Sequence, residues 1–342
     1  MKEKTRKSCW SKRLRCIARA YALVVLAAIT CGVSTLQSTL PVTASSAAPR
    51  ICVVVPHFKD EYWLSVGHGL MEQAKLSQAE VILFASGGYY GPEKQIELLM
   101  RCRARQATAI LLGAVSANDP ALLDAVQATA TQVPVVALVN ELNSPFLSGA
   151  VGVDWRQMGN VIGHFLRQKF PAEGPPVKAA LITGPAKSGW SPLLEIGLQQ
   201  GLDDSAAKIT FVGRSDTGLR QQLAAVEAAL KVDKGIQILI GSAPAIEGAM
   251  GLAANSDGVF PELVSTYISH SVRRGVQSGT VTAVAFDDPV EQGKLGIKLA
   301  LASRLGEFSP ILVGPEIQLI ERETDRANLI PLAPAHLSLR IE

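Results

Sequence analysis

Short apolar runs rich in β-branched residues alternate along the chain with longer segments of helical periodicity. Nearly continuous apolar runs are typical of parallel strands that are buried on both faces. They predict strands at residues 51–55, 81–84, 109–112, 135–138, 179–182, 209–212, 236–240, 263–268 and 281–286. Helices are predicted between them, at residues 63–76, 93–105, 120–130, 155–169, 193–202, 219–230, 245–254 and 289–305. Strands and helices that alternate in this way predict an α/β fold of right-handed βαβ units.

The chain is long enough for two lobes. About 295 residues follow a basic and apolar N-terminal segment. This length suffices for two lobes of on the order of 150 residues each. A strand-like run ends in a polar turn at Gly152, Val153 and Asp154, where we place the boundary. In open parallel sheets, ligands bind beyond the carboxyl ends of the strands. We therefore expect the functional residues directly after the strands, in a cleft between the lobes.

Residues 1–44 have the features of a secretory signal peptide. Eight basic residues and one acidic residue precede an apolar run at 20–36, and small residues follow at 42–44 and 46–48. Cleavage is therefore expected near 44–48. An uncleaved anchor helix is the alternative, because the run is at the short end of the roughly 17–25 residues that span a bilayer. Since no later apolar run is long enough to span a membrane, we expect an exported, soluble mature chain without stable membrane insertion.

Composition and charge exclude several classes of protein. The chain is 48% hydrophobic, which is too apolar for intrinsic disorder. Its net charge is +3, but the residues after the first 44 carry −4, which argues against nucleic acid or an anionic membrane as a partner. Two of the five cysteines, Cys52 and Cys102, remain after cleavage. They are equally well explained as a disulfide and as two buried thiols.

Tryptophan and tyrosine residues concentrate where the predicted strands end. Seven follow residue 48, and six of them lie at or within about eight residues after a strand-like run. The seven are Tyr62, Trp63, Tyr89, Tyr90, Trp155, Trp190 and Tyr267. Each one alone is well explained as a packing residue at the start of a helix. Because several converge on one cleft, we favour a binding site for a small ligand with polar and apolar parts.

Such a cluster suits a methylated amine. Several aromatic faces attract a quaternary or tertiary ammonium through the ring quadrupole, each contact contributing on the order of 0.5–2 kcal/mol. Asp60, just before Tyr62 and Trp63, would add a direct Coulomb attraction. It is equally well explained as the N-cap of the helix that starts near Tyr62.

Five stretches of the chain resemble a known family. They are PHFKDEYWLSV at 56–66, GGY at 87–89, VGVDW at 151–155, and two in the second half, at 241–247 and 263–270. They are similar to the type I periplasmic binding proteins and, more narrowly, to the TorT group. That group comprises periplasmic receptors that sense trimethylamine N-oxide (TMAO) and pass the signal to a membrane sensor histidine kinase. The resemblance covers roughly residues 50–310.

The resemblance implies a ligand cage of Trp63, Tyr89, Trp155 and Tyr267, with Asp60 beside it. It also implies that Asn140 and Asp287 lie on hinge-side loops that face the cleft, although each is equally well explained as a turn residue. Tyr62, which precedes Trp63, is a third candidate of lower rank. The implied location is the periplasm, and the implied partner is the periplasmic domain of a sensor histidine kinase.

The resemblance also implies how the lobes are assembled. Two Rossmann-like lobes with parallel sheets would be joined by a three-segment hinge, with crossovers near residues 154, 283 and 310. The N-terminal lobe would comprise 50–154 and 284–310, and the C-terminal lobe 155–283 and 311–342. Cys52 and Cys102 fall where the group has cysteines, which favours a disulfide.

The chain also departs from these relatives. Trp190 stands in a stretch, 186–192, that is more glycine-rich in the TorT group, and the tail at 315–342 matches poorly. The wider family mostly binds sugars, whose hydroxyls need many paired donors and acceptors, often Asp beside Arg. Here the fourth strand ends in Val139, Asn140 and Glu141 instead. We therefore expect a small, weakly hydrogen-bonding ligand rather than a sugar.

Enzymatic function is not expected. The five histidines, at 57, 68, 164, 270 and 336, show no HExxH or paired metal spacing, and no dinucleotide, Walker or GxSxG motif is present. We expect no metal and no cofactor. The main alternative is the substrate-binding component of an ABC importer for a different small solute or sugar, which would share the fold. A repressor core is disfavoured by the signal peptide and by the lack of an N-terminal helix-turn-helix.

Overall fold

The computed structural model describes residues 48–309, 311–322 and 324–342, so the predicted signal peptide lies outside the described residues. The strands in this part of the chain form two six-stranded sheets. Their central strands are almost completely buried, as continuous apolar runs require. No helix in the described part of the chain combines the length and apolar character that crossing a bilayer would need.

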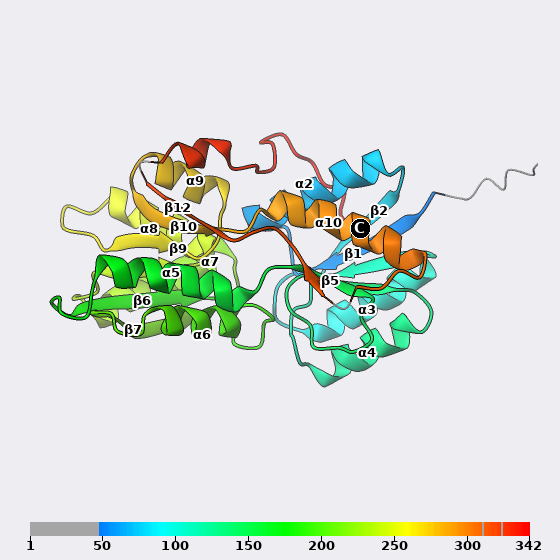
Figure 1. Cartoon of the computed structure of the whole chain (residues 1–342), viewed down its shortest axis with the longest axis horizontal. Helices are drawn as coiled ribbons and strands as arrows, with labels where there is room; N and C mark the ends of the chain where they lie inside the picture. Colours follow the sequence, from blue (N-terminus) through cyan, green and yellow to red (C-terminus); the bar gives the residue numbers. More distant parts are fainter. Residues whose placement is uncertain (1–47, 310, 323) are drawn as a thin grey trace, which may run out of the picture. The chain divides into compact units, whose positions relative to one another are not determined.

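The first sheet has the strand order β11-β5-β4-β3-β1-β2, and all neighbours are parallel. Its strands are β1 (Arg50–Val55), β2 (Glu80–Ala85), β3 (Ala109–Leu112), β4 (Val135–Val139), β5 (Gly149–Gly152) and β11 (Leu312–Val313). The associated helices are α2 (Glu61–Leu76), α3 (Pro92–Ala104), α4 (Pro120–Ala130) and α10 (Pro289–Arg304). Helix α2 packs against α10, and α3 against α4 (Figure 1). We call this unit the first lobe.

The second sheet has the order β12-β10-β9-β8-β6-β7, in which only β12 is antiparallel to its neighbour. Its strands are β6 (Val177–Thr183), β7 (Ala207–Arg214), β8 (Ile238–Gly241), β9 (Glu262–Ser265), β10 (Val281–Phe286) and β12 (Gln318–Glu321). The helices are α5 (Trp155–Lys169), α6 (Ser191–Gly201), α7 (Leu219–Val232), α8 (Ala243–Ala254), α9 (His270–Gln277) and the 3-10 helix η1 (Asp325–Leu329). This unit is the second lobe.

The two lobes repeat one topology. In each, the first strand of the lobe is flanked by the second and the third, so that the strand order reverses beside it. This is the doubly wound arrangement in which ligands bind at the carboxyl ends of the strands. The predicted α/β fold with two lobes is therefore confirmed.

Two of the predicted crossing points between the lobes disagree with the sheets that the neighbouring strands join. Strand β10 continues to Phe286 in the second sheet, where it pairs with β12, so the chain crosses after 286 rather than at 283. Strand β11 pairs with β5 of the first sheet, so the third crossing lies between 313 and 318 rather than at 310. In the tail, β12 and η1 lie in the second lobe, but Ile341 near its end pairs with Leu83 of β2 in the first. Segments this short carry no pattern that identifies the sheet they join.

Glycines allow the helices that carry the site to approach closely. A Cβ atom at Gly159 of α5 would overlap the carbonyl oxygen of Leu194, and one at Gly197 of α6 would overlap that of Arg156. The crossing of these helices fixes the position of their N-terminal ends, where Trp155 and Trp190 lie. The packing of two glycine-lined helices thus places two tryptophans beside each other.

We expect Gly197→Ala to destabilise the protein, because the added methyl group has no room between α5 and α6. Overpacking of this kind lowers the free energy of unfolding by about 1–3 kcal/mol. The matched control is Gly251→Ala in α8, where a Cβ atom meets no other atom within 4 Å. That substitution should raise stability by about 0.5–1 kcal/mol, because alanine favours a helix over glycine. Urea denaturation of both variants checks the prediction, and an equal effect of the two would contradict it.

Candidate ligand-binding site

A small cavity lies where the carboxyl ends of the two sheets meet. Its lining residues are Asp60, Tyr62, Trp63, Tyr89, Val139, Asn140, Trp155, Trp190, Thr217 and Tyr267. The empty volume is about 260 Å³. Because typical ligand pockets are roughly 300–1,000 Å³, a cavity of this volume suits only a small ligand.

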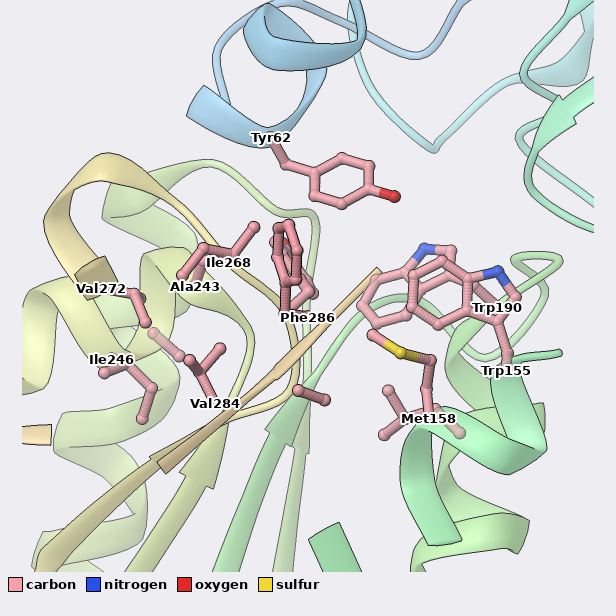
Figure 2. Close-up of a cluster of buried hydrophobic side chains, with 14 of the residues drawn as sticks. Tyr62, Trp155, Met158, Trp190, Ala243, Ile246, Ile268, Val272, Val284 and Phe286 are labelled. Carbon is pink, nitrogen blue, oxygen red and sulfur yellow. The ribbon is translucent and has the colours of Figure 1, made fainter. Parts of the chain in front are cut away.

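Aromatic rings from both lobes surround this cavity. The ring of Trp190 lies 5.5 Å from that of Trp155, 5.8 Å from that of Tyr267 and 6.4 Å from that of Tyr89, measured between centroids. Tyr62 of the first lobe completes the group, with its ring 5.3 Å from that of Tyr267. Figure 2 shows Tyr62 extending from α2 towards the second lobe, where the indoles of Trp155 and Trp190 lie side by side. Most of these pairs meet edge to face, which is the favourable geometry for aromatic rings.

A strained turn at the end of β4 orients two of the lining residues. Val139 has φ of 67°, which is costly for a β-branched residue. The amide of Asn140 donates to the carbonyl of Leu138, 2.7 Å away, which closes a γ-turn around Val139. The carbonyl of Val139 then accepts from Nε1 of Trp155 at 3.1 Å. Asn140 Nδ2 donates to the hydroxyl of Tyr89 at 3.2 Å.

Asp60 serves as a helix cap and as a contact between the lobes. Its Oδ1 accepts from the backbone N–H of Tyr62, at the start of α2, at 3.0 Å. Its Oδ2 accepts from the hydroxyl of Tyr267, in the second lobe, at 2.7 Å. Burial raises the pKa of Asp60 from 3.8 to about 7, although both hydrogen bonds oppose this shift. A carboxyl group on the cavity wall is thus only partly ionised near neutral pH.

Asp287 lies behind Tyr62 and does not line the cavity. Its Oδ2 accepts from the hydroxyl of Tyr62 at 2.7 Å and from Nε2 of Gln292 at 2.9 Å. Burial raises its pKa from 3.8 to about 6. Of the predicted site residues, the structure brings seven to the cavity: Trp63, Tyr89, Trp155, Tyr267, Asp60, Tyr62 and Asn140. Asp287 orients Tyr62 instead.

A loop of the second lobe docks beside the cavity against His57. The Nε2 atom of His57 lies 2.8 Å from Oγ1 of Thr217, and the backbone N–H of Tyr89 donates to Oδ1 of Asp216 at 3.4 Å. Burial lowers the pKa of His57 from 6.5 to about 4, although nearby Asp216 raises it. His57 is therefore neutral at pH 7, and it contacts Thr217 of the second lobe through a hydrogen bond rather than an ion pair.

Three lining residues, Val139, Trp190 and Thr217, were not among the predicted site residues. Trp190 follows strand β6, and its position after a strand was the available signal. Gly184 leaves the space that its indole occupies. Thr217 follows β7 in a segment with no distinctive pattern, so nothing in the sequence identified it.

The structure also answers two further questions, the state of the two cysteines and the presence of metal-ligand clusters. Cys52 of β1 and Cys102 of α3 form a disulfide. In the described residues, no group of three histidine, cysteine, aspartate or glutamate side chains could hold a metal ion.

Comparisons with known proteins agree with this architecture. Residues 51–307 match the family model of the periplasmic binding protein domain. The chain is 32% identical to the periplasmic protein TorT of Escherichia coli K12 over 302 residues, which covers 87% of this chain and 86% of TorT. A chain from the crystal structure of the TorS sensor domain–TorT complex in the presence of TMAO gives a TM-score of 0.76 at 28% identity. This match covers 86% of our chain and 100% of the other.

A further similar structure belongs to an ABC transporter solute-binding protein from Bradyrhizobium sp. BTAi1 with bound Bis-Tris. It gives a TM-score of 0.71 at 30% identity and covers 87% of this chain and 90% of the other. The homologues are solute-binding proteins and not enzymes. The doubly wound lobes, the cavity between their strand ends and these similarities lead to one conclusion: the chain belongs to the periplasmic binding protein family and, within it, to the TorT type.

Proposed function

We propose that this protein is a periplasmic receptor for a small methylated amine, with TMAO as the first candidate. The observation that carries the proposal is the closure of aromatic rings from both lobes around one small cavity, with the carboxyl group of Asp60 on its wall. The methyl groups of the ligand would contact the ring faces. The N-terminal segment would direct the chain to the periplasm.

The size and polarity of the cavity favour this ligand class over sugars. A methylated nitrogen gains on the order of 0.5–2 kcal/mol from each aromatic face, and more where water is excluded. A sugar would bring several hydroxyls, each of which needs a partner when buried. Most polar groups here already bond to one another: Tyr267 to Asp60, Asn140 to Tyr89, and Trp155 to the Val139 carbonyl. They leave few partners for hydroxyl groups.

Relatives support the same assignment. A TorS sensor domain–TorT complex, of which one chain is 28% identical to this chain, has been crystallised in the presence of TMAO. We infer that this chain likewise signals to the periplasmic domain of a membrane sensor histidine kinase.

The signal would arise from closure of the two lobes. Several hydrogen bonds join them in and beside the cavity, including those between Tyr267 and Asp60, between His57 and Thr217, and between the Ser271 amide and Glu61. Separation of the lobes would break these contacts. A ligand that binds better to the closed form shifts the population towards it, and the outer surface changes with it.

The adjacent residues Tyr89 and Tyr90 provide a direct test. Tyr89 lines the cavity, whereas the side chain of Tyr90 is 67% exposed. In calorimetric titrations with TMAO, Tyr89→Ala should weaken binding by about tenfold or more, which corresponds to about 1.4 kcal/mol. Tyr90→Ala should bind as the wild type does. Equal affinities of the two variants would contradict the proposed site.

A second function is favoured by one observation. The relative from Bradyrhizobium sp. BTAi1 is an ABC transporter solute-binding protein, and its bound Bis-Tris is an amine. Under this alternative the cavity would feed an importer rather than a kinase. A pull-down with the periplasmic domain of a sensor kinase, with and without TMAO, distinguishes the two. Binding that depends on TMAO supports the receptor, and the absence of binding supports the importer.

A further inference from the structure

The indole of Trp190 carries a hydrogen-bond donor that the protein does not use. The side chain lines the cavity and is 2% exposed, yet no acceptor among the described residues lies within reach of its Nε1. Buried N–H groups in folded proteins are almost always paired, so an unpaired one requires an explanation.

Three other donors around the cavity are already committed. Nε1 of Trp155 donates to the carbonyl of Val139, and the hydroxyl of Tyr267 donates to Asp60. The hydroxyl of Tyr62 donates to Asp287. Tyr89 accepts from Asn140 and keeps its own proton, but a hydroxyl can rotate that proton towards any neighbour. An indole N–H points in one fixed direction, so its partner must come to it.

The loop before Trp190 holds this direction in place. Oγ of Ser191 donates to the carbonyl of Gly184 at 3.0 Å, and it lies 2.9 Å from Oγ1 of Thr183. Oγ of Ser188 donates to the carbonyl of Pro185 and accepts from the Ser191 amide. Both serines are buried. The indole fills the space beside Gly184, where any side chain would overlap its ring.

We propose that Nε1 of Trp190 donates a hydrogen bond to an oxygen of the bound ligand. Trp190 is then a specificity-determining residue, which makes the cavity discriminate between a methylated amine that carries an oxygen acceptor, such as an N-oxide, and a fully methylated ammonium of similar size. This assignment rests on the proposed function and deepens it. The aromatic rings recognise the methyl groups, and Trp190 recognises the oxygen.

The test compares two tryptophans that differ in one respect. Trp190→Phe removes an unpaired N–H, whereas Trp155→Phe removes one that already bonds to Val139. Both variants and the wild type are titrated calorimetrically with TMAO and with tetramethylammonium. Trp190→Phe should weaken TMAO binding by about tenfold or more and tetramethylammonium binding by less than about threefold. Trp155→Phe should weaken both ligands by the same factor.

The outcomes separate this inference from the proposed function. If the ratio of the two affinities is unchanged in Trp190→Phe, or changes equally in Trp155→Phe, Trp190 is not the oxygen donor. If the wild type binds neither compound, the proposed function itself fails.

A second measurement observes ligand binding in the wild-type protein alone. In the wild type labelled with ¹⁵N-tryptophan, TMAO should move the Trp190 indole N–H resonance downfield, and tetramethylammonium should not. The resonance is assigned by its absence in Trp190→Phe. A shift of equal size with both compounds would overturn the proposal.

Discussion

The Asp60→Asn variant should be more stable than the wild type without ligand, and its advantage should grow with pH. Burial raises the pKa of Asp60 from 3.8 to about 7, so at pH 8 the folded protein contains a buried carboxylate that destabilises it. A shift of this size corresponds to about 4 kcal/mol at most, at 1.36 kcal/mol per unit. Asparagine can still cap α2 through its carbonyl oxygen. We expect its advantage to increase by about 2–3 kcal/mol between pH 5 and pH 8.

The direction of this pH dependence follows from how tightly the folded and unfolded states bind the proton. Because the pKa of Asp60 is higher in the folded protein than in the unfolded chain, the folded state binds the proton more tightly, and stability falls as pH rises through about 7. Asp287, with its pKa raised to about 6, acts in the same direction. His57 acts in the opposite direction, because its pKa is lowered to about 4 and stability rises with pH up to about 6.5. The difference between variant and wild type isolates Asp60.

Urea denaturation at both pH values measures this difference. The matched control is Asp154→Asn, because Asp154 caps α5 in the same way from an exposed position. Its effect on the free energy of unfolding should change little between pH 5 and pH 8. An advantage of Asp60→Asn that is the same at both pH values would contradict the prediction.

The expected result connects stability to binding. A buried carboxylate destabilises the empty protein, which is a common feature of functional sites. A ligand with a positive nitrogen would compensate for that charge, lower the pKa of Asp60 and release its proton. Asp60→Asn is therefore expected to gain stability and to lose affinity for the amine.

Removal of the disulfide should have an effect of similar size. Cys52 and Cys102 close a loop with a sequence separation of 50 residues. The loss of chain entropy in the unfolded state predicts a stabilisation of about 4 kcal/mol for a loop of this length. Both cysteines lie in the apolar cluster between the first sheet and helices α3 and α4. None of the cavity-lining residues belongs to this cluster, so ligand affinity should be unchanged at temperatures where the reduced protein is folded.

Guanidinium denaturation with and without a reductant provides the measurement. The wild type should lose about 4 kcal/mol on reduction. The double variant Cys52→Ala/Cys102→Ala should show the lower stability in both conditions and no response to the reductant. An unchanged denaturation midpoint of the reduced wild type would refute the prediction.

Much of the fold could be predicted from the alternation of apolar runs and helical segments. Helices α4 and α5 begin and end at the predicted residues. The eight-residue helix α9 was not predicted, because so short a segment shows little periodicity. Strand β11, of two residues, carries no pattern of its own and depends on β5 for its position.

The site illustrates what a residue pattern does and does not determine. Aromatic residues after the strands indicated the cavity, because the topology brings the carboxyl ends of the strands together. The direction of a single side chain does not follow from topology, and Asp287 faces the hydroxyl of Tyr62 rather than the cavity. The two explanations of Asp60 turn out to be compatible, because one carboxyl oxygen caps α2 and the other meets Tyr267. Trp190 depends on a glycine several residues earlier, and no local pattern reveals that.

A crystal structure of the protein grown with saturating TMAO tests the central claim most directly. We expect one molecule in the cavity, with its nitrogen within about 6 Å of several ring centroids, including those of Tyr89, Trp155 and Tyr267. A closed protein whose cavity stays empty at saturating TMAO would contradict the account. So would TMAO bound only elsewhere on the surface.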